Sequence, residues 1–305
     1  MNIGYIGNFE AKYSTENDRR WTFQKLGHNV YAFQENHTTK ELLLEYRDKL
    51  DVLFYSHTHG WEIDGLIEVF KEYKQVGVPT VSVHLDRWVG LDRVVDVGKE
   101  ATWHTEYIFM ADGSPEAVEL YEKHGLNWYY LRAAVVERDC YMAHPDPVNF
   151  PHEIVFVGSY GYHKEYPFRK KLIDALKKRY GDRFGHYGNG GIRNLRGHDL
   201  NVCYASSKIV VGDSCFGGRP NYVSDRYYET RGRGGFLLHP RVEGVDNVGI
   251  GYYEEENLES LFDTIEFYLK DEVLRKEMRV EGFEYVSQFG TYTNRAIELL
   301  DIISQ

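Results

Sequence analysis

The stretch Asn221-Tyr-Val-Ser-Asp-Arg-Tyr-Tyr-Glu-Thr-Arg-Gly-Arg-Gly-Gly-Phe-Leu-Leu-His-Pro240 combines a polar helix start, a run of charges, a glycine break and an apolar segment. Ser224 or Asp225 can cap a short helix that carries Arg226 and Glu229. The glycines that follow end this helix, and the next three apolar residues predict a short buried strand. The stretch therefore predicts a helix followed directly by a strand.

The same stretch has the chemistry to hold an anionic ligand that is rich in hydroxyl groups. A helix N-terminus and Arg226 suit phosphates, and the Glu229 carboxylate suits paired sugar hydroxyls. A surface helix with solvated charges fits the local pattern equally well. The rest of the chain has to decide between these two interpretations.

Length and composition place the chain among soluble globular proteins. Its 305 residues suffice for two domains, and its content is 42% hydrophobic and 27% charged. The 25 tyrosines suit clefts that hold rings, bases or sugars, although many will be ordinary packing residues. A net charge of -11 argues against broad binding to nucleic acid or anionic membranes, but it leaves room for a local basic cleft.

The cysteines and the first residues bear on the compartment. Cys140, Cys203 and Cys215 lack C-x-x-C spacing, which indicates reduced thiols rather than disulfides or a zinc site. Residues 1–7 have the pattern of a strand rather than a signal peptide. No apolar run nears the roughly 18 residues of a transmembrane helix. We expect a cytoplasmic protein with no membrane span.

Strand and helix patterns alternate along the first half of the chain. Buried strands are expected at residues 3–7, 29–33, 51–57, 80–84, 107–110 and 128–131, with helices between them. This alternation predicts a parallel sheet with right-handed crossovers. The strand ends at Asn8, His57 and Asp86 should meet at its carboxyl edge, where open α/β folds bind ligands.

Residues 144–151, with three prolines in eight residues, predict an interdomain linker. The alternation restarts after it, with strands expected at 153–157, 184–187 and 208–212. We expect an α/β protein of two Rossmann-like domains, residues 1–148 and 149–305, that face each other across a cleft able to close on a nucleotide. A complete G-x-G-x-x-G or Walker pattern is missing, which argues against an NAD-type oxidoreductase and against ATP hydrolysis.

A series of short motifs runs through the second half of the chain. They are Phe156-Val-Gly-Ser159 with Arg169 downstream, His186-Tyr-Gly188, Arg196-Gly197 with Leu200-Asn201, Lys208-Ile-Val-Val-Gly-Asp-Ser214, Ser224-Asp-Arg-Tyr-Tyr-Glu229, Gly234-Gly-Phe-Leu-Leu238 and Thr291-Tyr-Thr-Asn-Arg295. In this order they resemble the spore-maturation-protein-like branch of the group 1 (family 4) glycosyltransferases. The first half is similar only loosely, through residues 26–30 and 83–88. The resemblance implies a GT-B fold whose C-terminal domain binds the nucleotide-sugar donor, with a last helix that packs back on the first domain.

The resemblance also implies a donor site. Glu229 occupies the place of the glutamate that holds the donor ribose hydroxyls. Arg169 or Lys164 corresponds to the basic group that meets the diphosphate. Gly158 and Ser159 belong to a matching motif and are expected to bind the donor as well. No cofactor is implied beyond the nucleotide-diphosphate sugar, which is the donor substrate.

The resemblance implies a retaining reaction, and the lack of an Asp-x-Asp motif favours one without a metal. The charge on the leaving diphosphate must then be met by cations and helix amides, for which Arg226, Arg169 and the amides near Ser224 are candidates. The first glutamate of the family's E-x7-E pattern falls at Asn221. This departure leaves the contact to the sugar hydroxyls open.

Other strand ends supply further candidates. His84 and Asp86 are expected to line the acceptor or hexose pocket, with Asp86 as a candidate base, and loop hydrogen bonding is the alternative. Tyr187 and Gly188 are candidates for stacking on the base or bonding it through the backbone, with packing as the alternative. Residues 57–59 (His-Thr-His) lack an evident third metal ligand, so we expect no metal site.

The leading hypothesis is a cytoplasmic, metal-independent, retaining glycosyltransferase, and hexosyl transfer is expected. Its acceptor is open: a glycan, a small molecule, a protein or modified DNA. One alternative is a DNA-modifying glycosyltransferase that acts on a hydroxymethylated base and holds the polyanion with a basic cluster. Another is a non-catalytic nucleotide-sugar-binding protein of the same fold, which the Asn221 departure keeps open. The first interpretation of the basic cluster is binding of the donor diphosphate, and the second is that some of it holds a polyanionic acceptor. The cluster comprises Arg219, Arg226, Arg231, Arg233 and Arg241.

Overall fold

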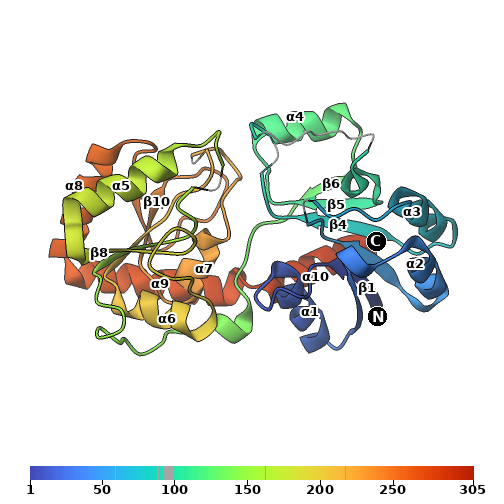
Figure 1. Ribbon diagram of the computed structural model, residues 1–305, viewed down its shortest axis with the longest axis horizontal. Helices are drawn as coiled ribbons and strands as arrows, with labels where there is room; N and C mark the ends of the chain where they lie inside the picture. Colours follow the sequence, from blue (N-terminus) through green and yellow to red (C-terminus); the bar gives the residue numbers. More distant parts are fainter. Residues whose placement is uncertain (59, 88, 92–98, 162, 217) are drawn as a thin grey trace. The chain divides into compact units, whose positions relative to one another are not determined.

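The computed structural model describes residues 1–305 except 59, 88, 92–98, 162 and 217. The chain forms two compact units (Figure 1). The first comprises Met1–Val89, the described part of Arg93–Arg132, and Tyr292–Gln305. The second comprises the described residues of Gly90–Asp92 together with Ala133–Thr291.

The first unit contains a six-stranded parallel sheet in the order β2-β1-β3-β4-β5-β6. Its strands are β1 (Asn2–Gly7), β2 (Asn29–Gln34), β3 (Val52–Tyr55), β4 (Thr80–His84), β5 (Tyr107–Met110) and β6 (Trp128–Tyr130). Its helices are α1 (Thr15–Lys25), α2 (Lys40–Tyr46), α3 (Leu66–Gln75), α4 (Pro115–Lys123) and α10 (Tyr292–Ile303).

Side chains of β1 show how the helices cover this sheet. Ile3 packs in one apolar cluster with Phe23 of α1 and Leu299 of α10. Ile6 packs in a separate cluster with Leu43 of α2. Successive strand residues point to opposite faces. Helices α1 and α10 therefore cover one face of the sheet, and α2 covers the other.

The second unit contains a five-stranded parallel sheet in the order β11-β10-β9-β7-β8. Its strands are β7 (Ile154–Val157), β8 (Phe184–Tyr187), β9 (Ile209–Val211), β10 (Leu237–Pro240) and β11 (Ile250–Tyr253). Its helices are α5 (Phe168–Tyr180), α6 (Gly197–Ser206), α7 (Arg226–Gly232), α8 (Leu258–Lys270) and α9 (Glu272–Phe289).

Both faces of the second sheet are covered as well. Phe156 of β7 packs with Leu172 of α5 and Leu261 of α8, whereas its neighbour Val155 packs with Leu200 of α6. Two parallel sheets in two units confirm the predicted α/β class with two Rossmann-like domains. No helix in the described part of the chain is long and apolar enough to cross a bilayer.

The two units divide after Arg132, earlier than the boundary expected at residue 148. The segment that follows Arg132 is packed and hydrogen-bonded within the second unit. Val135 belongs to an apolar cluster with Tyr228 of α7, and the Asn201 amide donates to the Asp139 and Tyr141 carbonyls at 2.8 and 2.9 Å. These contacts explain why the segment belongs to the second unit.

We predict that Leu299→Ala lowers the free energy of unfolding by about 3 kcal/mol, because Leu299 is 2% exposed in the first unit's core. Ile297→Ala, at a position on the same helix that is 46% exposed, should change it by less than about 1 kcal/mol. Urea unfolding followed by circular dichroism measures both. Equal losses in the two variants would contradict the packing of α10 described above.

Candidate functional site

Three strands of the second unit end side by side in the sheet order β9-β7-β8, and the turns that follow them form the candidate site. Gly158, after β7, donates its N–H to the carbonyl of Tyr187 at the end of β8 (2.8 Å). Gly188 has φ 125°, and a Cβ there would lie 2.2 Å from the Gly158 carbonyl oxygen. Only glycine fits this close approach between the two turns.

The side chain that organises this edge is Asp213, which lies two residues beyond β9 and is completely buried. Arg169, in the first turn of α5, donates its Nε–H to Asp213 Oδ2 at 2.9 Å. Arg226, the first residue of α7, donates from Nη1 to Asp213 Oδ1 at 3.1 Å and from Nε to the Val157 carbonyl at 2.7 Å. Arg226 Nη2 lies against Gly158, where a Cβ would come within 2.5 Å of it.

Two guanidinium groups thus share one carboxylate, which leaves a net positive charge in a largely buried place. Burial, followed by repulsion from Arg169, lowers the pKa of Arg226. Burial also acts to lower the pKa of Arg169, but the charge and hydrogen bonds of Asp213 outweigh it and raise that pKa. Asp213 therefore mainly compensates Arg169, and an anion bound beside Arg226 would complete the balance. The 13-residue helix α5 adds its N-terminal amides to the same end of the sheet.

A hydrogen-bond chain links the start of the α7 region to β10. Ser224 donates its N–H to Ser214 Oγ at 3.0 Å, and Ser214 Oγ lies 3.0 Å from His239 Nε2. His239 Nδ1 lies 2.7 Å from the Pro240 carbonyl, which can only accept, so Nδ1 carries the proton and Nε2 accepts from Ser214. Burial lowers the pKa of His239 to about 4, so this histidine is neutral.

Glu229 lies one turn beyond Arg226 on α7, and its side chain is 21% exposed. It forms an ion pair with Arg233, four residues further on. The prediction that this cluster of arginines holds a polyanion is wrong for two of its members. Arg233 is 5% exposed and Arg231 is completely buried, where Arg231 Nη1 donates to Asp246 Oδ1 at 2.7 Å. Both side chains are committed to partners inside the protein.

The backbone explains why Asn221 stands where the resemblance led us to expect a glutamate. Its φ is 56°, a left-handed conformation that asparagine adopts more readily than most residues with a side chain. Its N–H donates to the Glu243 carbonyl at 2.8 Å, and its Oδ1 lies against Gly244. Asn221 is thus part of a turn contact with the loop between β10 and β11.

Other predicted donor residues differ in their surroundings. Ser159 follows Gly158 and is half-buried, and Lys164 is exposed on the loop before α5. The Tyr187 ring is 2% exposed and packs beside Phe150, and its hydroxyl lies 2.9 Å from His152 Nδ1. A ring held in this way is unsuited to stacking on a base. At the end of β8 the backbone is therefore the part of the chain that can bond to the base.

The remaining predicted residues lie in the first unit. His84 ends β4 and is buried, with Nδ1 3.1 Å from the Asp86 carbonyl oxygen, so these two residues share a local turn. His57 Nδ1 lies 2.7 Å from an oxygen of the buried Glu35. Nowhere in the described residues do three or more His, Cys, Asp or Glu side chains gather in a way that suits a metal ion. Trp88 in the loosely similar stretch, and His59 beside His57, lie outside the described residues.

Sequence reasoning missed Asp213, Ser214 and His239 as members of the site. Asp213 and Ser214 end one of the quoted motifs directly after a strand, which is the position where ligand-site residues of open α/β sheets gather. That signal could have identified them. His239 lies within the β10 strand, and nothing in the local sequence distinguishes it from a core residue.

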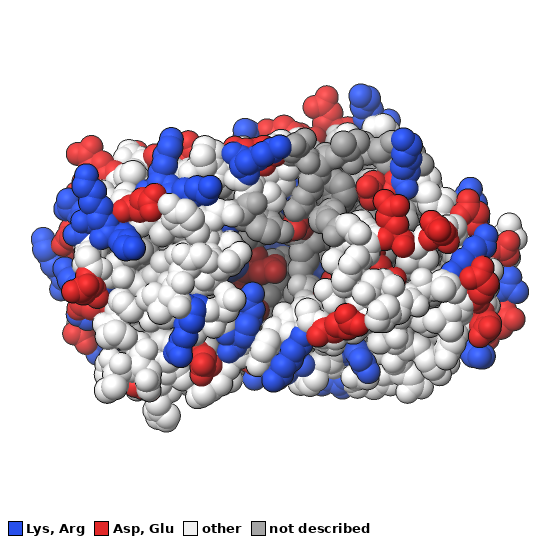
Figure 2. Space-filling model, in the orientation of Figure 1, with Lys and Arg blue, Asp and Glu red and all other residues white. Residues whose placement is uncertain are grey.

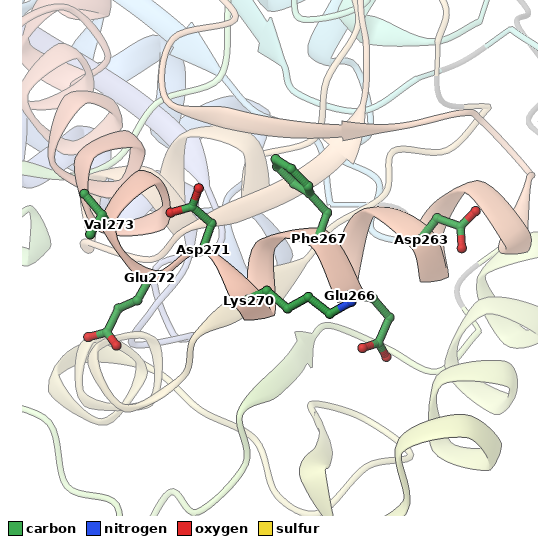
Figure 3. Close-up of a pocket in the computed structure, with 7 residues that line it drawn as sticks. All are labelled: Asp263, Glu266, Phe267, Lys270, Asp271, Glu272 and Val273. Carbon is green, nitrogen blue, oxygen red and sulfur yellow. The ribbon is translucent and has the colours of Figure 1, made fainter.

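A surface hollow of about 750 Å³ lies elsewhere on the second unit (Figure 3). It is formed where α8 ends and α9 begins, and none of the predicted site residues lines it. The end of α8 belongs to the amino side of a parallel sheet, because a helix runs back after each strand. The residues that line the hollow are Asp263, Glu266, Phe267, Lys270, Asp271, Glu272 and Val273.

On the face seen in Figure 2, basic and acidic side chains are interspersed rather than gathered into a broad basic surface.

Residues 169–301 match a family model described as "Glycosyl transferase-like". The match contains Arg169, Asp213, Arg226 and Glu229 and covers less than half of the chain. None of the curated proteins matches this chain.

Solved structures similar to this chain include several whose names specify a sugar nucleotide or sugar transfer. The Anabaena protein Alr3699/HepE, in complex with UDP and glucose, has a TM-score of 0.69 at 10% identity, with 100% of this chain and 99% of that chain covered. A trehalose-6-phosphate synthase studied for glycosyl transfer with retention has a TM-score of 0.66 at 8% identity and 99% coverage of both chains. T4 phage BGT, in complex with UDP-glucose, has a TM-score of 0.60 at 12% identity, with coverage of 97% and 96%. At these identities the likeness shows the fold, which is the predicted GT-B arrangement of two Rossmann-like domains.

His239 predicts a loss of stability in mild acid. Its pKa is about 4 in the folded chain and about 6.5 when unfolded, so the unfolded chain binds more protons between these values. Stability contributed by the neutral ring is therefore fully present above about pH 6.5 and declines by about 3 kcal/mol as the pH falls to about 4. Urea unfolding at several pH values should show this slope, and His239→Gln should flatten it. An unchanged slope in the variant would refute the assignment.

Proposed function

We propose that this chain is a glycosyltransferase that moves a sugar from a nucleotide-diphosphate sugar to a hydroxyl group of an acceptor. The observation that carries the proposal is the pair Arg169 and Arg226 on the single carboxylate of Asp213, at the carboxyl edge of a parallel sheet. This net positive charge suits a diphosphate. It lies in the segment that matches the glycosyl transferase-like family model.

In the proposed reaction the bond between the anomeric carbon and the phosphate oxygen breaks, and its electron pair leaves with the nucleoside diphosphate. A new bond joins the anomeric carbon to the acceptor oxygen. Arg226, Arg169 and the α5 amides stabilise the negative charge that grows on the leaving diphosphate. Because Arg226 is already bonded to Val157 and Asp213, it needs little reorganisation when that charge develops.

The finer parts of the proposal follow the sequence analysis. Transfer is retaining and metal-independent, the acceptor proton passes to the leaving phosphate oxygen, and the transferred group is a hexose. Glu229 binds the ribose, and Gly158, Ser159, Gly188 and Ser224 line the donor through the turns that carry them. Lys164 reaches the diphosphate from its exposed loop. His84 and Asp86 serve the acceptor side from the first unit.

Two relatives of similar fold support a uridine nucleotide as the first donor to test, because they were crystallised with UDP or UDP-glucose. The acceptor class is a glycan, a small molecule, a protein or modified DNA. Two of the five arginines that were predicted to hold modified DNA, Arg231 and Arg233, are buried, which leaves fewer cations for a polyanion. Transfer to modified DNA has no observation in its favour on this chain.

We predict that a thermal-shift screen of UDP-, GDP-, ADP- and CMP-linked sugars identifies at least one stabilising donor. Glu229→Gln should weaken that donor's affinity about tenfold or more, because it replaces a charged acceptor of the ribose hydroxyls by a neutral one. Glu281→Gln, on the exposed side of α9, is the matched control and should leave affinity unchanged.

Donor hydrolysis or transfer, assayed with the donor found in the screen, separates an enzyme from a non-catalytic binding protein. The proposal expects release of the nucleoside diphosphate by the wild type and much slower release by Glu229→Gln. A wild-type protein that binds no nucleotide sugar, or a Glu229→Gln variant with unchanged affinity and release, would overturn the assignment.

A further inference from the structure

Arg233 directly follows the seven-residue helix α7 and donates hydrogen bonds to several partners within the second unit. Its Nε donates to Glu229 Oε2, its Nη2 donates to Asp139 Oδ2 at 2.9 Å, and its Nη1 donates to Asn201 Oδ1 at 2.6 Å. Nη1 also reaches the Gly197 carbonyl at 3.3 Å. All three nitrogens of the guanidinium are therefore engaged, and the side chain is 5% exposed.

The partners of Arg233 are themselves fixed. Asn201 is completely buried on α6, and its amide nitrogen donates to the carbonyls of Asp139 and Tyr141 at 2.8 and 2.9 Å. Because its amide nitrogen is used in this way, its oxygen is left to face Arg233. Two segments outside α7, the one with Asp139 and helix α6, thus determine the plane of the guanidinium, and that plane determines where the Glu229 carboxylate lies.

Glu229 differs from Arg233 in exposure. Its side chain is 21% exposed, compared with 5% for Arg233, so Glu229 is the more accessible member of the ion pair. A carboxylate offers about four lone-pair positions, and Arg233 uses one of them on Oε2. The remaining positions can accept hydrogen bonds from two neighbouring hydroxyl groups.

We propose that Arg233 is a positioning residue that makes Glu229 selective for a nucleotide with both ribose hydroxyls. The inference rests on the proposed function and adds that the donor site discriminates ribonucleotides from 2′-deoxyribonucleotides through this ion pair. A carboxylate held in one orientation can bond to both hydroxyls at once. A carboxylate that rotates freely must first lose conformational entropy to do so, which weakens binding. A site built to bond a hydroxyl discriminates against the analogue that lacks it.

Arg231 provides a matched control two residues away. It is also buried on α7 and also bonded to a carboxylate, but its partner is Asp246, and its Nε donates to the Tyr227 carbonyl at 2.9 Å. A variant of Arg231 reports the general effect of disturbing a buried arginine in this helix. A variant of Arg233 reports the same effect together with the loss of support for Glu229.

The test is calorimetric titration of UDP and 2′-deoxy-UDP into the full-length wild type and the variants Arg233→Gln, Arg233→Lys and Arg231→Lys. We expect the wild type to prefer UDP by about tenfold or more. Arg233→Gln should reduce this preference to less than about threefold, mainly by weakening UDP. Arg233→Lys should recover part of it, and Arg231→Lys should keep the wild-type ratio.

A folded Arg233→Gln protein that keeps the wild-type ratio would overturn the inference, because Arg233 would then only join segments of the fold. If that variant does not fold, Asp139→Asn decides, since it removes the charge on the second partner of Arg233 at nearly constant volume. Its ratio should fall below that of the wild type, and an unchanged ratio overturns the inference. Failure of the wild type to bind either nucleotide would instead overturn the proposed function itself.

Discussion

The sharing of Asp213 between Arg169 and Arg226 is the interaction on which the rest of the second unit's carboxyl edge depends. A carboxylate buried without a cation would be strongly unfavourable, and a second arginine beside it leaves a positive charge that only an anion can balance. Because Arg226 also bonds the Val157 carbonyl, the same interaction ties α7 to the end of β7. The electrostatic need for a ligand and the local architecture therefore have one origin.

The turns at this edge follow from the same constraint. Gly158 must lack a side chain to accommodate Arg226, and Gly188 must lack one to approach Gly158. The chain from Ser224 through Ser214 to His239 then holds the segment before α7 with a neutral imidazole, so no further cation is placed beside the two arginines. At the C-terminal end of the short helix, Arg233 holds Glu229. A charged centre and a polar clamp are thus carried by one seven-residue helix.

The sequence was informative about strands and poor about the partners of charged side chains. Alternating patterns predicted both parallel sheets, because burial on two faces is recorded directly in residue type. Residue type alone did not distinguish Arg226, at the carboxyl edge of the sheet, from the buried Arg231 and Arg233. Burial of these two arginines depends on partners far away in the chain, namely Asp246, Asp139 and Asn201. The sequence also did not show why asparagine stands at position 221, because the cause is a positive φ in a turn that contacts the loop after β10. The roles of His84 and Asp86 remain predictions.

The central claim is that the uncompensated positive charge around Asp213 binds the diphosphate of the donor. Calorimetric titration of uridine, UMP and UDP into the wild-type protein tests it most directly, because the three ligands share a base and a ribose and differ only in phosphate. The account predicts that affinity rises steeply along the series, with the largest gain, about tenfold or more, on adding the second phosphate. Equal affinities for UMP and UDP would contradict it.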